Sequence, residues 1–204
     1  IGIERNIGLA HRRLAILDLS SAGRQPMSSY DGRYVIVFNG EIYNHLTLRY
    51  ELQAKQGNVI WRGHSDTETL LTGFVIWGIQ ATIERCIGMF AFAVWDKKQR
   101  VLTLGRDRLG EKPLYYGWVN EAFVFGSELK ALRSYPGFAN PVCRQALAQY
   151  LRFMYVPAPR SIYQDIYKLE PGCLLTINTT SSLIQGSFDL GEMNYHLLGN
   201  EGDG

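Results

Sequence analysis

The seven-residue run Met89-Phe90-Ala91-Phe92-Ala93-Val94-Trp95 constrains the fold most strongly, because none of its positions is polar. A strand with one face in water alternates apolar and polar residues, whereas an unbroken apolar run of this length is typical of a strand buried on both faces. The run is also far too short to cross a bilayer. We therefore expect a sheet that is covered by helices on the outside and by a second sheet on the inside.

The remaining pattern predicts strands and helices without strict βαβ alternation. Expected strands lie at 7–10, 14–19, 33–38, 100–105, 114–119 and 122–125, and expected helices follow residue 41 up to Gly57 and lie at 65–78, 80–87, 128–133 and 144–153. Consecutive strands joined by short turns form antiparallel meanders. The predicted class is therefore α+β, with helices packed on antiparallel sheets.

Two helix signals are specific enough to test. Ile42, Leu46 and Tyr50 recur at helical spacing before Gly57 and predict one apolar helix face. Ser65-Asp66-Thr67-Glu68 fits a capping box, with Ser65 as N-cap and Glu68 at the third helical position.

Composition excludes several function classes. A formal charge of +2, from 21 basic and 19 acidic residues, gives no footprint for nucleic acid or an anionic membrane. Three cysteines without metal-ligand spacing predict a reduced, cytoplasmic protein without a zinc site or any other metal site.

Both ends of the sequence differ from its middle. The first residues read like part of a hairpin and lack an initiator Met, so we expect upstream sequence to be missing. Prolines crowd between Pro136 and Pro171, as at a domain edge or connector. Residues 1–178 are predicted to be one domain, incomplete at its N-terminus, and 179–204 a peripheral tail or linker.

The segment Asn39-Gly40-Glu41 follows a strand and places an amide side chain, a backbone N–H and a carboxylate together. Such a group can hold a polar substrate. The alternative is that Asn39-Gly40 only makes a tight turn.

Several longer motifs occur together in one order. They are His11-Arg12-Arg13-Leu14-Ala15-Ile16, Ala22-Gly23-Arg24-Gln25-Pro26-Met27, Asn39-Gly40-Glu41-Ile42-Tyr43-Asn44, Ser65-Asp66-Thr67-Glu68, Arg106-Asp107-Arg108-Leu109-Gly110 and Gly126-Ser127-Glu128-Leu129-Lys130-Ala131-Leu132. From about residue 7 to residue 177, the chain resembles the glutaminase domain of glutamine-hydrolysing asparagine synthetases, a class II amidotransferase. The resemblance implies a four-layer αββα sandwich of the N-terminal nucleophile type.

The resemblance also implies a nucleophilic cysteine at a processed N-terminus, whose thiol attacks the carboxamide of glutamine. No cysteine stands at the start of this sequence, and Cys86, Cys143 and Cys173 lie in contexts suited to structural roles. We therefore expect the 204-residue chain not to hydrolyse glutamine by itself.

Site residues follow from the same resemblance. The Asn39 side chain and the Gly40 N–H would form an oxyanion hole, and Arg13 would bind the α-carboxylate of glutamine. Its ammonium group would be bound by Glu41 and Asp66, with the backbone carbonyls of Ile16 and Leu17 as helpers. Asp66 has a structural role as an alternative, because an acid in the first turn of a helix interacts favourably with the helix dipole.

No cofactor is expected in this chain. ATP and Mg²⁺ are implied for a separate synthetase domain, whose Ser-Gly-Gly-x-Asp-Ser phosphate loop is absent here; the charged loop 106–113 does not fit a phosphate loop either. Expected partners are glutamine and the synthetase domain, and the resemblance leaves room for a homodimer. Two alternatives stay open: a binding domain of this fold without catalysis, or the amidotransferase domain of a relative with another acceptor.

Overall fold

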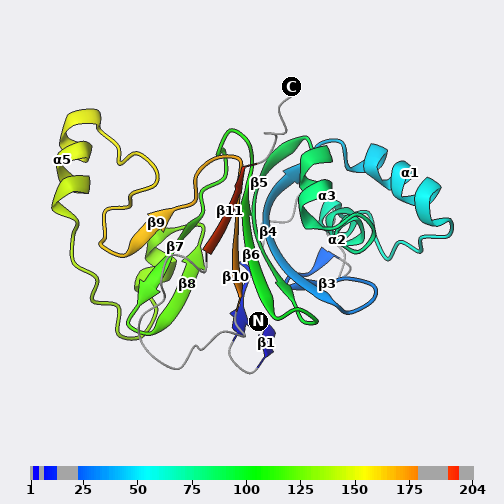
Figure 1. Cartoon of the computed structure of the whole chain (residues 1–204), viewed down its shortest axis with the longest axis horizontal. Coiled ribbons are helices and arrows are strands. Elements are labelled where there is room, and N and C mark those ends of the chain that lie inside the picture. The colour runs from blue at the N-terminus through cyan, green and yellow to red at the C-terminus, as the bar shows by residue number, and fades with distance from the viewer. Residues whose placement is uncertain (1, 5–6, 13–22, 179–192, 198–204) are drawn as a thin grey trace.

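A six-stranded antiparallel sheet lies at the centre of the computed structural model, which describes residues 2–4, 7–12, 23–178 and 193–197 (Figure 1). Its strands run in the order β11 (Met193–Leu197), β10 (Cys173–Asn178), β6 (Val101–Arg106), β5 (Gly88–Asp96), β4 (Tyr34–Ile42) and β3 (Met27–Ser28). A three-stranded sheet has the order β8 (Ala122–Gly126), β7 (Tyr115–Val119) and β9 (Ile166–Lys168), and β1 (Gly2–Glu4) pairs with β2 (Ile7–Leu9).

Helices cover the outer faces of the two larger sheets. In Figure 1, α1 (His45–Gln56), α2 (Asp66–Ile76) and α3 (Ile79–Arg85) lie on one side of the six-stranded sheet, and the β7–β9 sheet lies on the other. Leu132 of α4 (Leu129–Arg133) packs with residues of the β7–β9 sheet, and α5 (Arg144–Phe153) stands at the far end. The predicted order of helix, sheet, sheet and helix is confirmed.

Strand β5 contributes to two cores through its two faces. Phe90, Phe92 and Val94 belong to the core beneath α2 and α3, while Ala91, Ala93 and Trp95 belong to the core between the sheets. The alternation follows from the twofold period of a strand. The prediction from the apolar run is thus confirmed.

Strand β4 extends four residues beyond the predicted end at Phe38. Its pairing with β5 continues from Asn39 opposite Ala91 to Ile42 opposite Gly88. The reading of Asn39-Gly40 as a tight turn is therefore wrong, because the turn is made by the two residues that follow Ile42. Asn44 holds that turn: its amide donates to the carbonyl of Arg85 and accepts from the N–H of Ile87.

The apolar face predicted for α1 is also wrong. Leu46 and Tyr50 are 61% and 74% exposed, and the buried positions are Leu48, Arg49 and Leu52. Ile42 still belongs to β4, so its spacing to Leu46 is not a helical one. By contrast, Gly57 ends α1 as predicted, and α5 has the predicted bounds.

The charged loop after β6 is anchored by Arg106, the last residue of the strand, and by Asp107, which follows it. Asp107, 1% exposed, accepts hydrogen bonds from the N–H groups of Leu109, Glu111 and Lys112 and from that of Phe90 in β5. The guanidinium of Arg106 donates to three carbonyl oxygens, those of Gly110, Lys112 and Leu169. These bonds give the loop a structural role.

Strand β11 falls within the segment predicted as a tail, and it pairs antiparallel with β10 at the edge of the six-stranded sheet. The predicted strand 14–19 lies outside the described residues. The domain division at residue 178 stays a prediction.

Candidate active site

Beyond its short pairing with β3, strand β4 has an open edge that presents backbone N–H groups. Tyr43 donates to the carbonyl of Ile87 and Lys97 to that of Arg33, so the odd-numbered residues of β4 are the ones that exchange hydrogen bonds with β5. The even-numbered residues therefore direct their N–H groups to the opposite edge. Phe38 N–H donates there to Oε1 of Gln25 at 2.6 Å.

Gly40 is the next even-numbered residue, and Ile42 N–H beyond it donates to Oδ2 of Asp66 at 2.9 Å. The N–H of Gly40 lies between those of Phe38 and Ile42, which both have acceptors. No acceptor for the Gly40 N–H occurs among the described residues. A Cβ at this position would lie 2.1 Å from the carbonyl oxygen of Met89, so only glycine fits here. Among the described residues, the strand thus offers one N–H without an acceptor, at a place that admits no side chain.

Asn39 lies beside this donor, on the face of β4 that looks toward the second sheet. Val35 and Val37 precede it on that face and pack in the core between the sheets. The half-buried carboxamide of Asn39 donates through Nδ2 to Oγ of Ser127 at 3.0 Å. Sequence reasoning assigned no role to Ser127, and nothing local could have revealed a contact across 88 residues.

Asp66 is the first residue of α2 and is 5% exposed. Besides the bond from Ile42, its Oδ1 accepts from the N–H of Thr67 at 2.8 Å. The hydroxyl of Thr67 also donates to Oδ1, at 3.4 Å, whereas Oδ2 can accept a further hydrogen bond. The acid therefore stabilises the helix start, as the structural alternative proposed, and keeps acceptor capacity beside Glu41.

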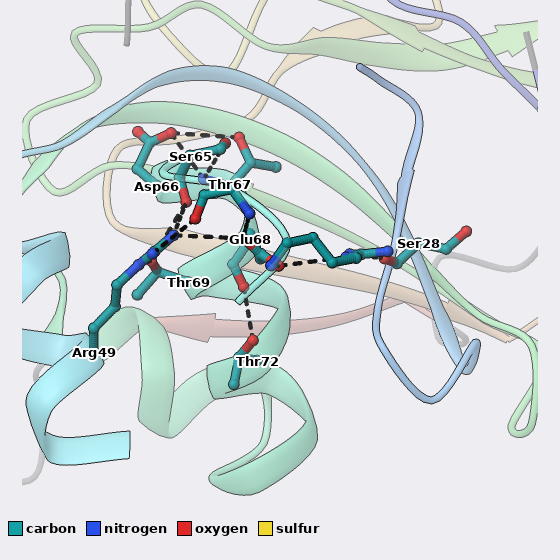
Figure 2. A network of polar contacts seen from close by, with 10 residues as sticks. Ser28, Arg49, Ser65, Asp66, Thr67, Glu68, Thr69 and Thr72 are labelled. Carbon is teal, nitrogen blue, oxygen red and sulfur yellow. Dashed lines mark hydrogen bonds and ion pairs between the residues drawn. The ribbon is translucent and has the colours of Figure 1, made fainter. Parts of the chain in front are cut away.

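A buried charge network holds the start of α2 in place (Figure 2). From α1, Arg49 donates to Oγ1 of Thr69 and to the carbonyls of Gly63 and Ser65, and its guanidinium lies 3.5 Å from the carboxylate of Glu68. Ser65 is the N-cap as predicted, and its hydroxyl accepts from the N–H of Thr67.

The other half of the predicted capping box is wrong. Glu68 accepts from the N–H groups of Arg62 and Gly63 in the preceding loop, in place of the N–H of Ser65. Two arginines near the carboxylate draw it toward that loop, since charge-assisted bonds are stronger than a neutral cap. The result still serves the site, because the loop and the first turn of α2 are tied together behind Asp66.

His45, the first residue of α1, was missed by sequence reasoning. Burial lowers its pKa, and the nearby carboxylates of Asp66 and Glu41 only partly oppose this shift. The imidazole is therefore neutral at pH 7 and adds no positive charge beside the two acids.

None of the buried thiols is suited to nucleophilic attack. Burial raises the pKa of Cys86 to about 12, and it also raises the pKa of Cys173. Both remain protonated at neutral pH. Cys143 precedes α5, at the opposite end of the molecule from α1 (Figure 1).

Three predicted site residues, Arg13, Ile16 and Leu17, lie outside the described residues. Within the described ranges, His, Cys, Asp and Glu side chains form no group of three or more that could hold a metal ion. The helices found there are all too short or too polar to cross a membrane. The structure places Asn39, Gly40 and Glu41 in succession on β4 and brings Asp66 to the N–H of the next residue, Ile42.

Comparison with known proteins adds a family and a fold. A family model described as a glutamine amidotransferase domain matches residues 1–187. The chain is 40% identical over 174 residues to the glutamine-hydrolysing asparagine synthetase 1 of Bacillus subtilis strain 168, covering 85% of this chain and 27% of that protein. It is 38% identical over 183 residues to synthetase 3 of the same strain, covering 86% and 28%.

Among solved structures, the glutamine phosphoribosylpyrophosphate amidotransferase of B. subtilis, complexed with ADP and GMP, superposes with a TM-score of 0.61 at 20% identity. The likeness covers 92% of this chain and 34% of that one. At this identity it establishes the fold alone, and it confirms the predicted α+β architecture. The chain spans little more than a quarter of the length of the two synthetases.

Proposed function

Because the chain belongs to the glutamine amidotransferase domain family, we propose that it is the glutaminase part of a glutamine-hydrolysing asparagine synthetase. In this proposal glutamine is hydrolysed to glutamate and ammonia, and the ammonia amidates aspartate in a synthetase part of a longer polypeptide. The two B. subtilis relatives support this assignment, since each is named for the whole reaction and is several times longer than the matched region.

The N–H of Gly40, which has no acceptor within the described ranges, lies beside the Asn39 carboxamide, and this observation carries the proposal. Attack of a thiolate on the carboxamide carbon of glutamine forms a C–S bond and leaves a negative charge on the former carbonyl oxygen. Donors fixed in advance around that oxygen stabilise it by about 2.7 to 4 kcal/mol each. Gly40 is held by the β4–β5 ladder, so its N–H needs no rearrangement to serve.

Substrate binding at the same edge fits the charges of glutamine. Its ammonium group would lie against Glu41 and Asp66, which face no cationic imidazole because His45 is neutral. Its carboxylate would be bound by Arg13, with the carbonyls of Ile16 and Leu17 near the ammonium group. These assignments extend the resemblance residue by residue.

Truncating Asn39 tests the function directly. In the full-length protein we expect Asn39→Ala to lower glutamine-dependent turnover by about 10² to 10³-fold, with synthesis from added ammonia unchanged. Gln56→Ala is a matched control, since it deletes an exposed carboxamide at the end of α1. Equal loss of both activities, or turnover by Asn39→Ala within threefold of wild type, would refute the oxyanion assignment.

The 204-residue chain by itself should not release ammonia from glutamine. The buried Cys86 and Cys173 cannot supply a thiolate near pH 7, and neither is the N-terminal cysteine that the proposal requires. Glutaminase activity of this chain that survives substitution of all three cysteines would contradict the proposed nucleophile.

ATP and Mg²⁺ would act in the synthetase part. The charged loop 106–113 does not fit a nucleotide phosphate, because Arg106 already donates to three carbonyls and Asp107 is turned inward. We also propose a cytoplasmic location, which agrees with three cysteines that form no disulfide.

A further inference from the structure

We propose that Ser127 is a positioning residue, which holds the carboxamide of Asn39 in the orientation that stabilises the oxyanion. The inference rests on the proposed function, because it assigns a task to a second residue of the same site. Its starting point is the 3.0 Å hydrogen bond from Nδ2 of Asn39 to Oγ of Ser127.

This bond joins two different layers of the molecule. Asn39 belongs to β4 in the six-stranded sheet, and Ser127 directly follows β8 in the three-stranded sheet. The backbone on both sides of Ser127 is anchored: Gly126 pairs with Tyr115 in β7, and α4 begins two residues later with Leu132 buried beneath it. The hydroxyl is therefore a fixed point against which a side chain can be oriented.

An asparagine side chain needs such a fixed point. Rotation about its last torsion is soft, so a carboxamide without a partner samples many orientations. A rotation of about 180° about this torsion exchanges Nδ2 for Oδ1. The carboxamide would then direct an acceptor, in place of a donor, at the oxyanion. One N–H of Nδ2 bonds to Ser127, and the second N–H of the same nitrogen remains for the oxyanion.

The placement also explains why the residue acts through Asn39 and not on the substrate. The free N–H of Gly40 and the carboxylate of Asp66 lie along the open edge of β4, whereas Ser127 reaches Asn39 from the opposing sheet. Removing the hydroxyl should therefore affect the chemical step and leave the binding of glutamine intact. The motif 126–132 thereby gains a function in addition to starting α4.

A double-mutant cycle in the full-length protein tests the proposal, with Asn39→Ala, Ser127→Ala and the double variant. We expect Ser127→Ala to lower kcat for glutamine about five- to tenfold, which is the loss of about one hydrogen bond. KM for glutamine should change by less than twofold, and ammonia-dependent synthesis should not change. In the Asn39→Ala background, Ser127→Ala should have no further effect, because it has no amide left to orient.

Ser134→Ala is the matched control. Ser134 lies at the C-terminal end of α4, and its hydroxyl donates to the carbonyl of Lys130. Loss of this hydroxyl therefore affects the same helix but no part of the site. A second measurement uses the 204-residue chain: in ¹⁵N–¹H spectra, the side-chain amide pair of Asn39 should shift in Ser127→Ala and stay in place in Ser134→Ala.

The outcomes separate this inference from the proposed function. If Asn39→Ala retains wild-type kcat, the oxyanion assignment and the role of Ser127 both fail. If Asn39→Ala is impaired but Ser127→Ala is not, or if the two losses multiply, Ser127 does not act through Asn39 and only the positioning role is overturned. An Asn39 amide pair that is unmoved in Ser127→Ala overturns it as well.

Discussion

Replacing Asp66 separates its structural role from its proposed role in binding glutamine. Alanine removes the acceptor for two backbone N–H groups, but the two losses differ. Thr67 N–H also donates to Oγ of Ser65 at 3.1 Å and keeps that partner. Ile42 N–H loses its acceptor in a buried place, which costs about 1.5 to 3 kcal/mol for a bond to a charged group. Loss of the favourable helix-dipole interaction adds about 0.3 to 1 kcal/mol.

Asparagine at the same position gives a graded result. Its Oδ1 can still accept from Ile42, so we expect Asp66→Ala to lower the unfolding free energy by about 2 to 4 kcal/mol and Asp66→Asn by about 1 kcal/mol. Urea unfolding of the chain at pH 7 measures both, and unchanged slopes would confirm that only stability has changed. Equal destabilisation by the two substitutions would refute the reasoning about Ile42.

The asparagine variant then tests binding in a nearly intact fold. Its side chain has no charge to attract the ammonium group, so in the full-length protein KM for glutamine should rise about tenfold, while ammonia-dependent synthesis is unchanged. An unchanged KM in a folded Asp66→Asn protein would leave Asp66 with its structural role alone.

Three further predictions concern the scaffold. Burial would raise the pKa of Asp96, but hydrogen bonds, first of all from Arg33, lower this pKa below its ordinary value. The contribution of Asp96 to stability is therefore present above about pH 4 and is lost as the pH falls through the folded pKa. Asp96→Asn should lower stability at pH 7 and flatten the decline in stability that urea unfolding shows as pH falls below about 4. Phe92→Ala should cost about 3 to 5 kcal/mol by the same assay, against at most about 0.5 kcal/mol for the exposed Leu46→Ala. Ser65→Ala should lower the unfolding free energy by only about 0.5 kcal/mol, because the N–H of Thr67 also donates to the carboxylate of Asp66. A loss above about 2 kcal/mol would show that Asp66 does not substitute for the Ser65 hydroxyl as acceptor.

Local signals in the sequence predicted much of the scaffold. The apolar run of β5 indicated two cores, Gly57 indicated the end of α1, and Ser65 indicated the start of α2. Each of these rests on interactions within a few residues or on a strict period, which a single sequence displays.

What could not be predicted depends on distant partners. Asn39-Gly40 is a common turn pair, and only the pairing with Ala91 and Phe90 keeps it in a strand. Glu68 would close a capping box in isolation, but Arg49 in another helix and the loop residues Arg62 and Gly63 hold its carboxylate away from Ser65. The site residues themselves were found by resemblance, and their roles stay predictions until the substitutions above are made.

The two cores that share β5 have a consequence for the order in which the chain can fold. When the helices have docked on Phe90, Phe92 and Val94, the row of Ala91, Ala93 and Trp95 is still open until residues 114–119 and 173–177 arrive from later in the sequence. A nascent or truncated chain that ends before these two segments exposes an apolar sheet face and an unpaired strand edge. Expression of the first 110 residues alone should therefore yield aggregate. Self-association should stop only when residues 114–119 and 173–177 cover the row of Ala91, Ala93 and Trp95.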